Sequence, residues 1–262
     1  MFSRRLVDQA IVDWQFEGFA WLVDNFESSS GLSETELWLP IPKYFPEARG
    51  RALADHIFDC VKRQCRFGDD DVFELIAMEG QPDFDLGGLA MIQTEGNLAC
   101  GTYQFISKAH GGPKEIIRYD AGLADNPAQL VATFAHELGH ALHMRTNDQI
   151  DEPPELYELF TDLTAVFLGY GVFLSNARFE FSQFSDGDRQ GWQASGAGYL
   201  PEVDLIFAMA LFMSIKNLPE SLATPHLKPH LQKMLTKAFR QLSKLEDRVA
   251  SLRERVPPKS EA

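Results

Sequence analysis

Apolar residues recur at helical spacing in two segments of the N-terminal half, residues 4–26 and 47–65, which predicts two amphipathic helices. Three shorter segments follow, and each is rich in β-branched and aromatic residues: VFELIAM from Val72, ACGTYQFIS from Ala99 and KEIIRYD from Lys114. This pattern predicts three strands. The last two are separated by KAHGGP, whose Gly-Gly-Pro sequence predicts a hairpin turn.

After the third strand the spacing of apolar residues is helical. Asp125 or Asn126 can cap a helix that has Pro127 at its first position and runs to about residue 146. A loop rich in Asp, Glu and Pro separates this helix from the next one, which is predicted over residues 155–174. Two long neighbouring helices are therefore expected in the middle of the chain.

The remainder of the chain adds a loop and two more helical segments. Residues 178–199 mix polar, Gly and aromatic residues without a period, which predicts a long loop, and residues 201–216 predict a helix. Residues 221–256 predict a C-terminal helix with a short heptad seam. The seam consists of Leu231, Leu235, Ala238, Leu242, Leu245, Val249, Leu252 and Val256. It would pack either on its own domain or on a second copy, as a homodimer through the C-terminal helix.

Charge and composition narrow the classes of partner and compartment. The net charge of −14, from 38 acidic and 24 basic residues, would repel a phosphate backbone, so nucleic-acid binding is not expected. Three cysteines in unrelated contexts, Cys60, Cys65 and Cys100, fit a reducing compartment better than a disulfide framework. Acidic residues interrupt the apolar N-terminus, unlike a targeting segment, and DLIFAMALFMSIK is too short to span a bilayer. A cytoplasmic protein without membrane binding is expected.

Residues 134–145, FAHELGHALHMR, contain two histidines four positions apart. In a helix, His136 and His140 project from one face, and each imidazole can give one nitrogen to zinc at about 2.0–2.1 Å. Glu137 is rotated off that line, so its carboxylate can act as a general base on a water molecule. HELGH is thus the HExxH pattern of zinc metallopeptidases. The alternative is a histidine pair that is hydrogen-bonded on a partly buried helix face.

Catalytic zinc normally has three protein ligands, so a third must come from elsewhere. The metzincin pattern is excluded, because His143 and Thr146 stand where it has a glycine and a third histidine. Glu158 and Asp162 lie one turn apart on the next helix, which is otherwise largely apolar. Such a pair costs repulsion and desolvation unless a cation or a donor compensates it.

The pair also has a second interpretation, a solvated acidic edge that includes Glu152 and Glu155.

The arrangement HELGH…ELFTD resembles the gluzincins, the thermolysin-like group of zinc metallopeptidases, over about residues 130–171. The resemblance implies that Glu158 is the third zinc ligand and that Asp162 accepts a hydrogen bond from the outer N–H of His136. It also implies a strand beside the cleft that pairs with an extended peptide. KEIIRYD is the expected strand, with an ordinary core strand as the alternative.

The residue that stabilises an oxyanion is less clearly marked by the sequence. Tyr199 is the first choice, because it follows SGAG and precedes a helix, and glycine-rich surroundings permit close approach to a cleft. His226 and His230 are rivals in a segment that contains prolines. His143 is either a support for the metal site or a surface histidine.

These observations predict an α+β fold with a small mixed or antiparallel N-terminal sheet and a mainly helical C-terminal half. We expect one zincin-like domain over residues 1–262, with an α/β part at 1–122, metal-site helices at 123–220 and the C-terminal helix at 221–256. The expected reaction is hydrolysis of a peptide or protein substrate with one zinc ion and with Glu137 as the base. The alternatives are a zinc-binding protein without peptidase activity and an interaction protein that uses the C-terminal helix.

Overall fold

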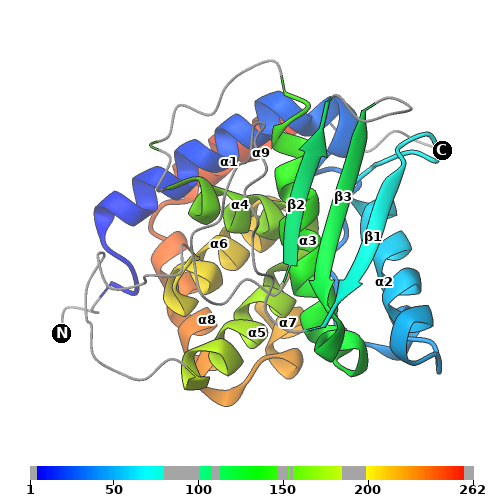
Figure 1. Cartoon of the computed structure of the whole chain (residues 1–262). Helices are drawn as coiled ribbons and strands as arrows, with labels where there is room; N and C mark the ends of the chain where they lie inside the picture. Colours follow the sequence, from blue (N-terminus) through cyan, green and yellow to red (C-terminus); the bar gives the residue numbers. More distant parts are fainter. Residues whose placement is uncertain are drawn as a thin grey trace. The chain divides into compact units, whose positions relative to one another are not determined.

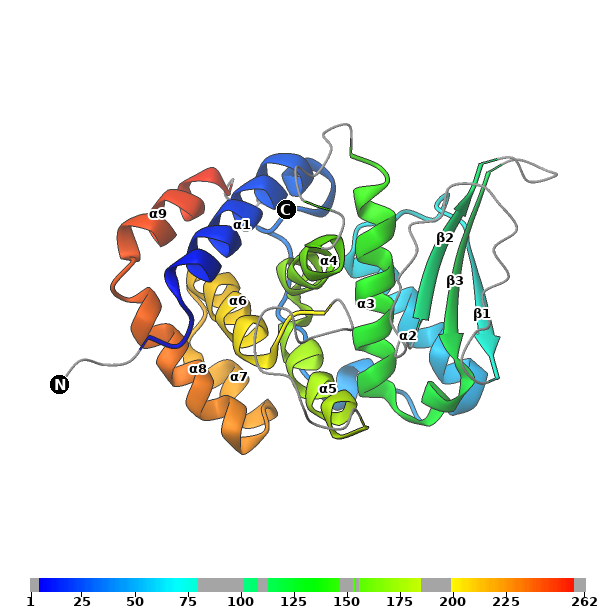
Figure 2. The same cartoon turned by 60° about the vertical axis from the view of Figure 1, so that its left-hand side comes forward.

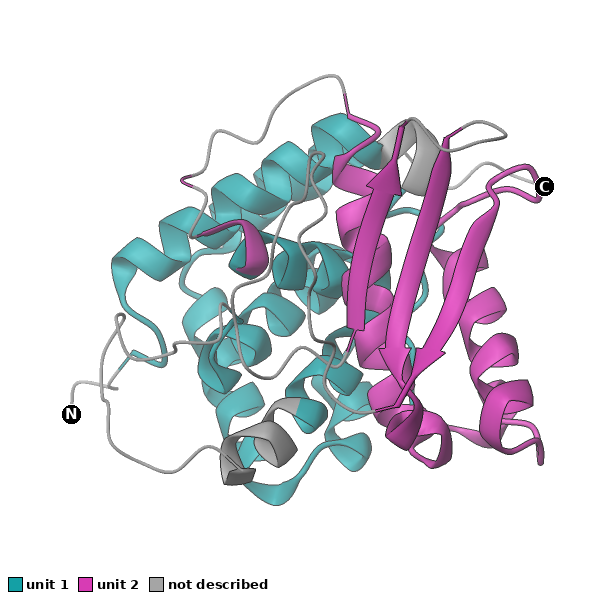
Figure 3. Ribbon diagram, viewed as in Figure 1, with its two compact units in different colours: residues 1–40, 159–188, 199–262 teal, residues 41–158, 189–198 magenta. Residues whose placement is uncertain are grey.

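The computed structural model (Figure 1) divides into two compact units, which Figure 3 distinguishes by colour. It describes residues 5–79, 101–107, 113–146, 153, 156–184 and 199–256. Unit 1 consists of residues 1–40, 159–188 and 199–262, and unit 2 of residues 41–158 and 189–198. The fold is α+β, as predicted, with a small sheet and a helical C-terminal half. A single domain over residues 1–262 stays a prediction.

The sheet belongs to unit 2 and has the order β1-β3-β2. Its strands are β1 (Phe73–Met78), β2 (Gly101–Ile106) and β3 (Lys114–Asp120). Strand β1 runs parallel to β3 and β2 runs antiparallel to it, so the sheet is mixed. The antiparallel pairing of β2 and β3 agrees with the predicted hairpin, whose turn lies outside the described residues.

The position of β3 corrects one expectation. KEIIRYD does not offer its edge to a substrate: β3 is the central strand and is hydrogen-bonded on both sides, which confirms the alternative of an ordinary core strand. Its backbone groups are used by the sheet, because Ile117 lies between Leu75 of β1 and Tyr103 of β2. Among the described strands, β2 takes the edge position on the other side of β3 from β1.

Two helices of unit 2 pack on the same face of the sheet (Figure 2). They are α2 (Gly50–Gln64) and α3 (Pro127–His143). The ring of Phe134 on α3 meets Phe58 of α2 and Tyr119 of β3 edge to face, with centroids 5.3 and 5.4 Å apart. Phe58 also contacts Phe73 of β1. This aromatic cluster fixes α3 against the sheet, because such contacts add to the burial of large rings.

The described part of unit 1 is helical. Its elements are α1 (Gln9–Ser30), most of α4 (Tyr157–Ala165), a π-turn (Val166–Tyr170), α5 (Gly171–Phe184), α6 (Glu202–Ile215), α7 (Glu220–Ala223), α8 (Pro229–Leu242) and α9 (Glu246–Arg255). Short 3-10 turns lie at Pro42–Tyr44 and Ala121–Asp125 in unit 2 and at Thr224–His226 in unit 1. Helix α6 packs on α5, α8 and α9. It is apolar almost all round, as expected of a helix at the centre of a core.

Three helical segments differ from their predicted form. Helix α5 continues to Phe184, although residues 178–199 lack a helical period; residues 185–198 lie outside the described part. The helix predicted over 155–174 is broken at Gly169, whose φ of 92° only glycine adopts readily. The single helix predicted over residues 221–256 is wrong: this span contains most of α7, a 3-10 turn, α8 and α9. A heptad spacing does not distinguish one helix from two that bury the same side.

One helical stretch, Tyr157–Ala177, is long and apolar enough to cross a bilayer by composition alone. Within the structure, 89% of its most apolar window is buried. That degree of burial is typical of a core helix in a folded domain.

Candidate metal centre

The HELGH segment lies in the last turns of α3, as its spacing predicts. Asn126 caps this helix by accepting a hydrogen bond from the backbone N–H of Gln129, and Pro127 stands in its first turn. Every residue from Leu130 to Leu142 is buried except Ala132. His136, Glu137 and His140 therefore lie inside unit 2, where unpaired polar groups are costly.

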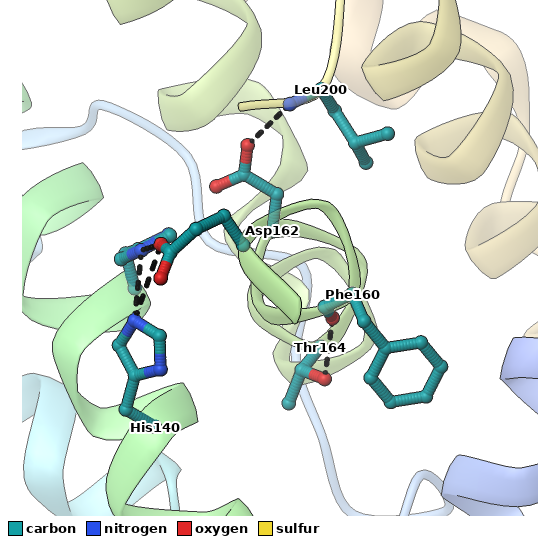
Figure 4. A network of polar contacts seen from close by, with 7 residues as sticks. His140, Phe160, Asp162, Thr164 and Leu200 are labelled. Carbon is teal, nitrogen blue, oxygen red and sulfur yellow. Dashed lines mark hydrogen bonds and ion pairs between the residues drawn. The ribbon is translucent and has the colours of Figure 1, made fainter. Parts of the chain in front are cut away.

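Glu158, in the first turn of α4, meets the two histidines of α3. Its Oε2 lies 3.0 Å from Nε2 of His136 and 3.4 Å from Nε2 of His140. The two Nε2 atoms are 3.2 Å apart. Figure 4 shows the His140 ring pointing from its helix into these contacts. Among the described residues, these three form the one group of His, Cys, Asp or Glu side chains that could hold a metal ion together.

The three distances fit one face of a tetrahedron around a metal ion. A zinc ion with bonds of about 2.0–2.1 Å has ligand atoms about 3.3 Å apart, and the observed edges are 3.0, 3.2 and 3.4 Å.

Hydrogen bonds alone do not account for all three edges. With both imidazoles neutral and the carboxylate ionised, one edge always joins two donors or two acceptors. A cation among the three atoms satisfies every edge at once.

The surroundings of Glu158 favour its ionised form. Burial works against ionisation of its carboxyl, but hydrogen bonds from His136 and His140, together with the charge that these rings have when protonated, outweigh burial and hold its pKa well below the usual range. The carboxyl is therefore ionised at neutral pH. An ionised carboxylate is the form that binds a metal ion.

Glu137 lies beside the three grouped side chains and faces strand β2. The backbone N–H of Tyr103 donates a hydrogen bond to its carboxylate. A Cβ added at Gly101 would lie 2.9 Å from Oε1 of Glu137 and 2.6 Å from Cγ2 of Thr133, so β2 approaches α3 too closely there for any side chain. Burial raises the pKa of Glu137, although the neighbouring histidine charges oppose this shift. A buried carboxylate with a raised pKa is a suitable proton acceptor.

Asp162 and Tyr199 belong to unit 1, so their roles beside the ligands of unit 2 stay predictions. Asp162 is buried, and its Oδ2 accepts a hydrogen bond of 2.8 Å from the backbone N–H of Leu200 (Figure 4). That contact joins α4 to the segment that leads into α6. Tyr199 is half-buried directly before Leu200.

The other histidines lie outside the three-residue group. His143 is the last residue of α3, and burial together with the charges of His140 and His136 lowers its pKa to about 3. It is therefore neutral at physiological pH. His226 ends a 3-10 turn in unit 1, and its backbone carbonyl accepts a hydrogen bond from Asn176. His230 lies 3.4 Å from Glu202, so both rivals of Tyr199 take part in contacts within unit 1.

Sequence reasoning missed Gly101 and Tyr103. Both lie in a segment that was predicted as a strand, and nothing in its pattern indicates that its backbone meets Glu137. A glycine inside a strand is a recognised sign of close backbone approach, and that was the one available signal.

Comparisons of the chain with protein-family models, with curated proteins and with solved structures give no match. The resemblance to gluzincins therefore rests on the HELGH and ELFTD residues and on the geometry of unit 2. That geometry establishes a group of two histidines and one glutamate that could hold a metal ion.

Proposed function

We propose that this chain is a zinc-dependent peptidase of the gluzincin type. The observation that carries the proposal is the set of three ligands, His136, His140 and Glu158, with no fourth His, Cys, Asp or Glu among the described residues of the group. Structural zinc sites usually fill all four positions with protein, whereas catalytic sites keep one open. The carboxylate of Glu137, which lies beside the group and is not a member of it, supports the same conclusion, because a structural site needs no base.

Zinc is the proposed ion because of the donor atoms. Two imidazole nitrogens and one carboxylate oxygen are a common ligand set of catalytic zinc, and calcium and magnesium bind mainly oxygen ligands. The distances between the three atoms also match the separation of ligand atoms that zinc–ligand bond lengths imply.

In the proposed reaction a bound zinc ion supplies Lewis acidity, which polarises the scissile carbonyl and acidifies a water molecule. Glu137 accepts a proton from the attacking water at a carboxylate oxygen and then donates it to the leaving amine. Asp162 is proposed to orient His136 by accepting its outer N–H, and Tyr199 is proposed to donate a hydrogen bond to the oxyanion.

The proposed substrate is a peptide or protein. An extended peptide can add to the free edge of a sheet, and β2 is the described strand that has such an edge near Glu137. The net charge of −14 favours basic or neutral substrates. A cytoplasmic location and the absence of membrane and nucleic-acid partners remain part of the proposal, as does a homodimer through the C-terminal helices.

The test is the Glu137→Gln variant of the zinc-loaded protein. We expect about one zinc ion per chain by elemental analysis, as in the unmodified protein, and turnover of a peptide library that is lower by a factor of about 10² to 10⁴. The control is Glu74→Gln, the same change at an exposed position of β1, which should leave both quantities unchanged. Turnover of Glu137→Gln at the unmodified rate would contradict the assignment of the base. Bound zinc without any turnover would leave a metal-binding protein, the second candidate.

A further inference from the structure

Tyr103 is attached to two parts of unit 2 at once. Its backbone N–H donates to Glu137 of α3, and its hydroxyl donates a 3.0 Å hydrogen bond to Oε1 of Glu115 on the neighbouring strand β3. Tyr103 pairs with Ile117 across the two strands, so the hydroxyl reaches diagonally to Glu115. Strand β2 is thus attached to α3 through the main chain of Tyr103 and to β3 through the side chain of Tyr103.

Glu115 forms an ion pair with Arg145, which lies just beyond the C-terminal end of α3. Its Oε2 accepts from a guanidinium nitrogen of Arg145, two residues beyond the end of α3. Arg145 also donates a 2.6 Å hydrogen bond to Asp71. The guanidinium lies over the ring of Phe67, 4.5 Å from its centroid, and such stacking adds to the attraction. We call Tyr103, Glu115, Arg145 and Asp71 the anchoring network.

The anchoring network has a geometric consequence for Glu137. Strand β2 is an edge strand of the described sheet, so it has one strand partner and not two. At Gly101 the strand lies so close to α3 that an added Cβ would be 2.6 Å from Thr133 Cγ2 and 2.9 Å from Glu137 Oε1. A small outward movement of β2 would withdraw the Tyr103 N–H from the carboxylate. The hydroxyl of Tyr103 opposes such a movement, because Glu115 is tied to the end of α3.

We propose that Tyr103 is a positioning residue for Glu137: its hydroxyl, through Glu115 and Arg145, holds β2 where the Tyr103 N–H orients the carboxylate. The inference rests on the proposed peptidase function, in which Glu137 is the base. A base that is misplaced by about 1 Å can lose about a hundredfold in rate, so an orienting hydrogen bond has a measurable effect. The opposing interpretation is a stabilising hydrogen bond of the sheet that has no effect on Glu137.

The experiment compares Tyr103→Phe with Tyr119→Phe in the full zinc-loaded chain. Tyr119 is the matched control, because it is a buried tyrosine of the same sheet that packs on α3 through Phe134 and is not part of the anchoring network. Three quantities are measured: zinc per chain, hydrogen exchange of the residue-103 amide by NMR, and kcat with KM.

For Tyr103→Phe we expect unchanged zinc content, amide exchange that is about tenfold faster, and kcat about tenfold lower at a KM within about twofold of the original. Tyr119→Phe should change neither kcat nor the residue-103 exchange. Equal losses of kcat in both variants, or unchanged exchange and kcat in Tyr103→Phe, would overturn the inference.

A second pair of variants approaches the same contact through Glu115. Glu115→Gln keeps an acceptor for the Tyr103 hydroxyl and should retain most of kcat, whereas Glu115→Ala should match Tyr103→Phe. Because both residues act through one contact, the double variant Tyr103→Phe with Glu115→Ala should lose no more than either alone. Additive losses would overturn the inference.

The outcomes also separate this inference from the proposed function. A zinc-loaded chain without any turnover would refute the peptidase proposal, and amide exchange alone would then decide the inference. Faster exchange in Tyr103→Phe but not in Tyr119→Phe would support the anchoring network, and unchanged exchange would overturn it.

Discussion

Helix α3 of unit 2 and helix α6 of unit 1 are both buried along almost their whole length, but they bury different side chains. From Leu205 to Met213, α6 contains only apolar residues, and each is at most 1% exposed. Helix α3 buries two histidines and a glutamate, which are 4–7% exposed. Since buried polar groups cost free energy unless they are paired, α6 contributes to stability, while α3 gives up part of that contribution to assemble a site.

Two carboxyls, the half-buried Glu158 of unit 2 and the buried Asp204 of unit 1, also differ in their surroundings. The pKa of Glu158 is held low by the histidines of α3, which outweigh its burial. The pKa of Asp204, in the first turn of α6, is raised to about 6 by burial and by the nearby charge of Asp8. The comparison teaches that depth alone does not set the pKa of a carboxyl; the sign of the charges around it also does.

The largest effect is expected from Phe207→Ala in α6. Phe207 is fully buried, and truncation of such a side chain typically costs about 3–5 kcal/mol of the free energy of unfolding. Urea unfolding measures this loss, and elemental analysis of the folded variant should still find about one zinc ion per chain. Loss of zinc from a folded Phe207→Ala variant would contradict the conclusion that α6 contributes to stability and not to the metal site of α3.

His140→Ala makes the converse test on α3. Loss of a supporting contact around a metal already weakens binding about 10–100-fold, so loss of a ligand should weaken zinc binding by more than about 100-fold, which competition with a zinc chelator measures. The control is His226→Ala, since His226 ends a 3-10 turn in unit 1 and is not in the three-residue group. Equal zinc affinities of the two variants would contradict the assignment of His140 as a ligand.

The smallest effect concerns Asp204. A carboxyl with a raised folded-state pKa binds more protons in the folded than in the unfolded protein, so its contribution to stability falls as the pH rises from about 4 to about 6. Asp204→Asn removes this penalty. The substitution should therefore raise the free energy of unfolding by about 2 kcal/mol more at pH 7.5 than at pH 4. Urea unfolding at both pH values gives the difference. A difference that does not change with pH would show that Asp204 is not destabilised by burial.

Local patterns in the sequence predicted most helices and strands and the three grouped side chains. HELGH required only that α3 be helical, and Glu158 required only that the next helix begin near Tyr157. Both conditions depend on residues that are close together in the chain; Asn126, for example, caps the helix that contains HELGH. For this reason the group of two histidines and one glutamate could be inferred before any coordinates.

Features that depend on distant segments could not be inferred in the same way. The order of strands depends on how β1 reaches β3, and a hydrophobic pattern does not contain that information, so the edge was assigned to the wrong strand. The break at Gly169 is stabilised by its carbonyl, which accepts a hydrogen bond from Trp38 N–H, more than a hundred residues earlier in the chain. A lone glycine inside a helical pattern does not predict such a partner.

The close approach at Gly101 provides a signature by which distant relatives could be sought. An HExxH match on its own is too short to be selective. A search pattern that also requires a strand glycine followed two positions later by tyrosine, ahead of the histidine helix, would add the residues through which β2 meets Glu137. Chains that satisfy both would be the first in which to look for the same pairing of strand and helix.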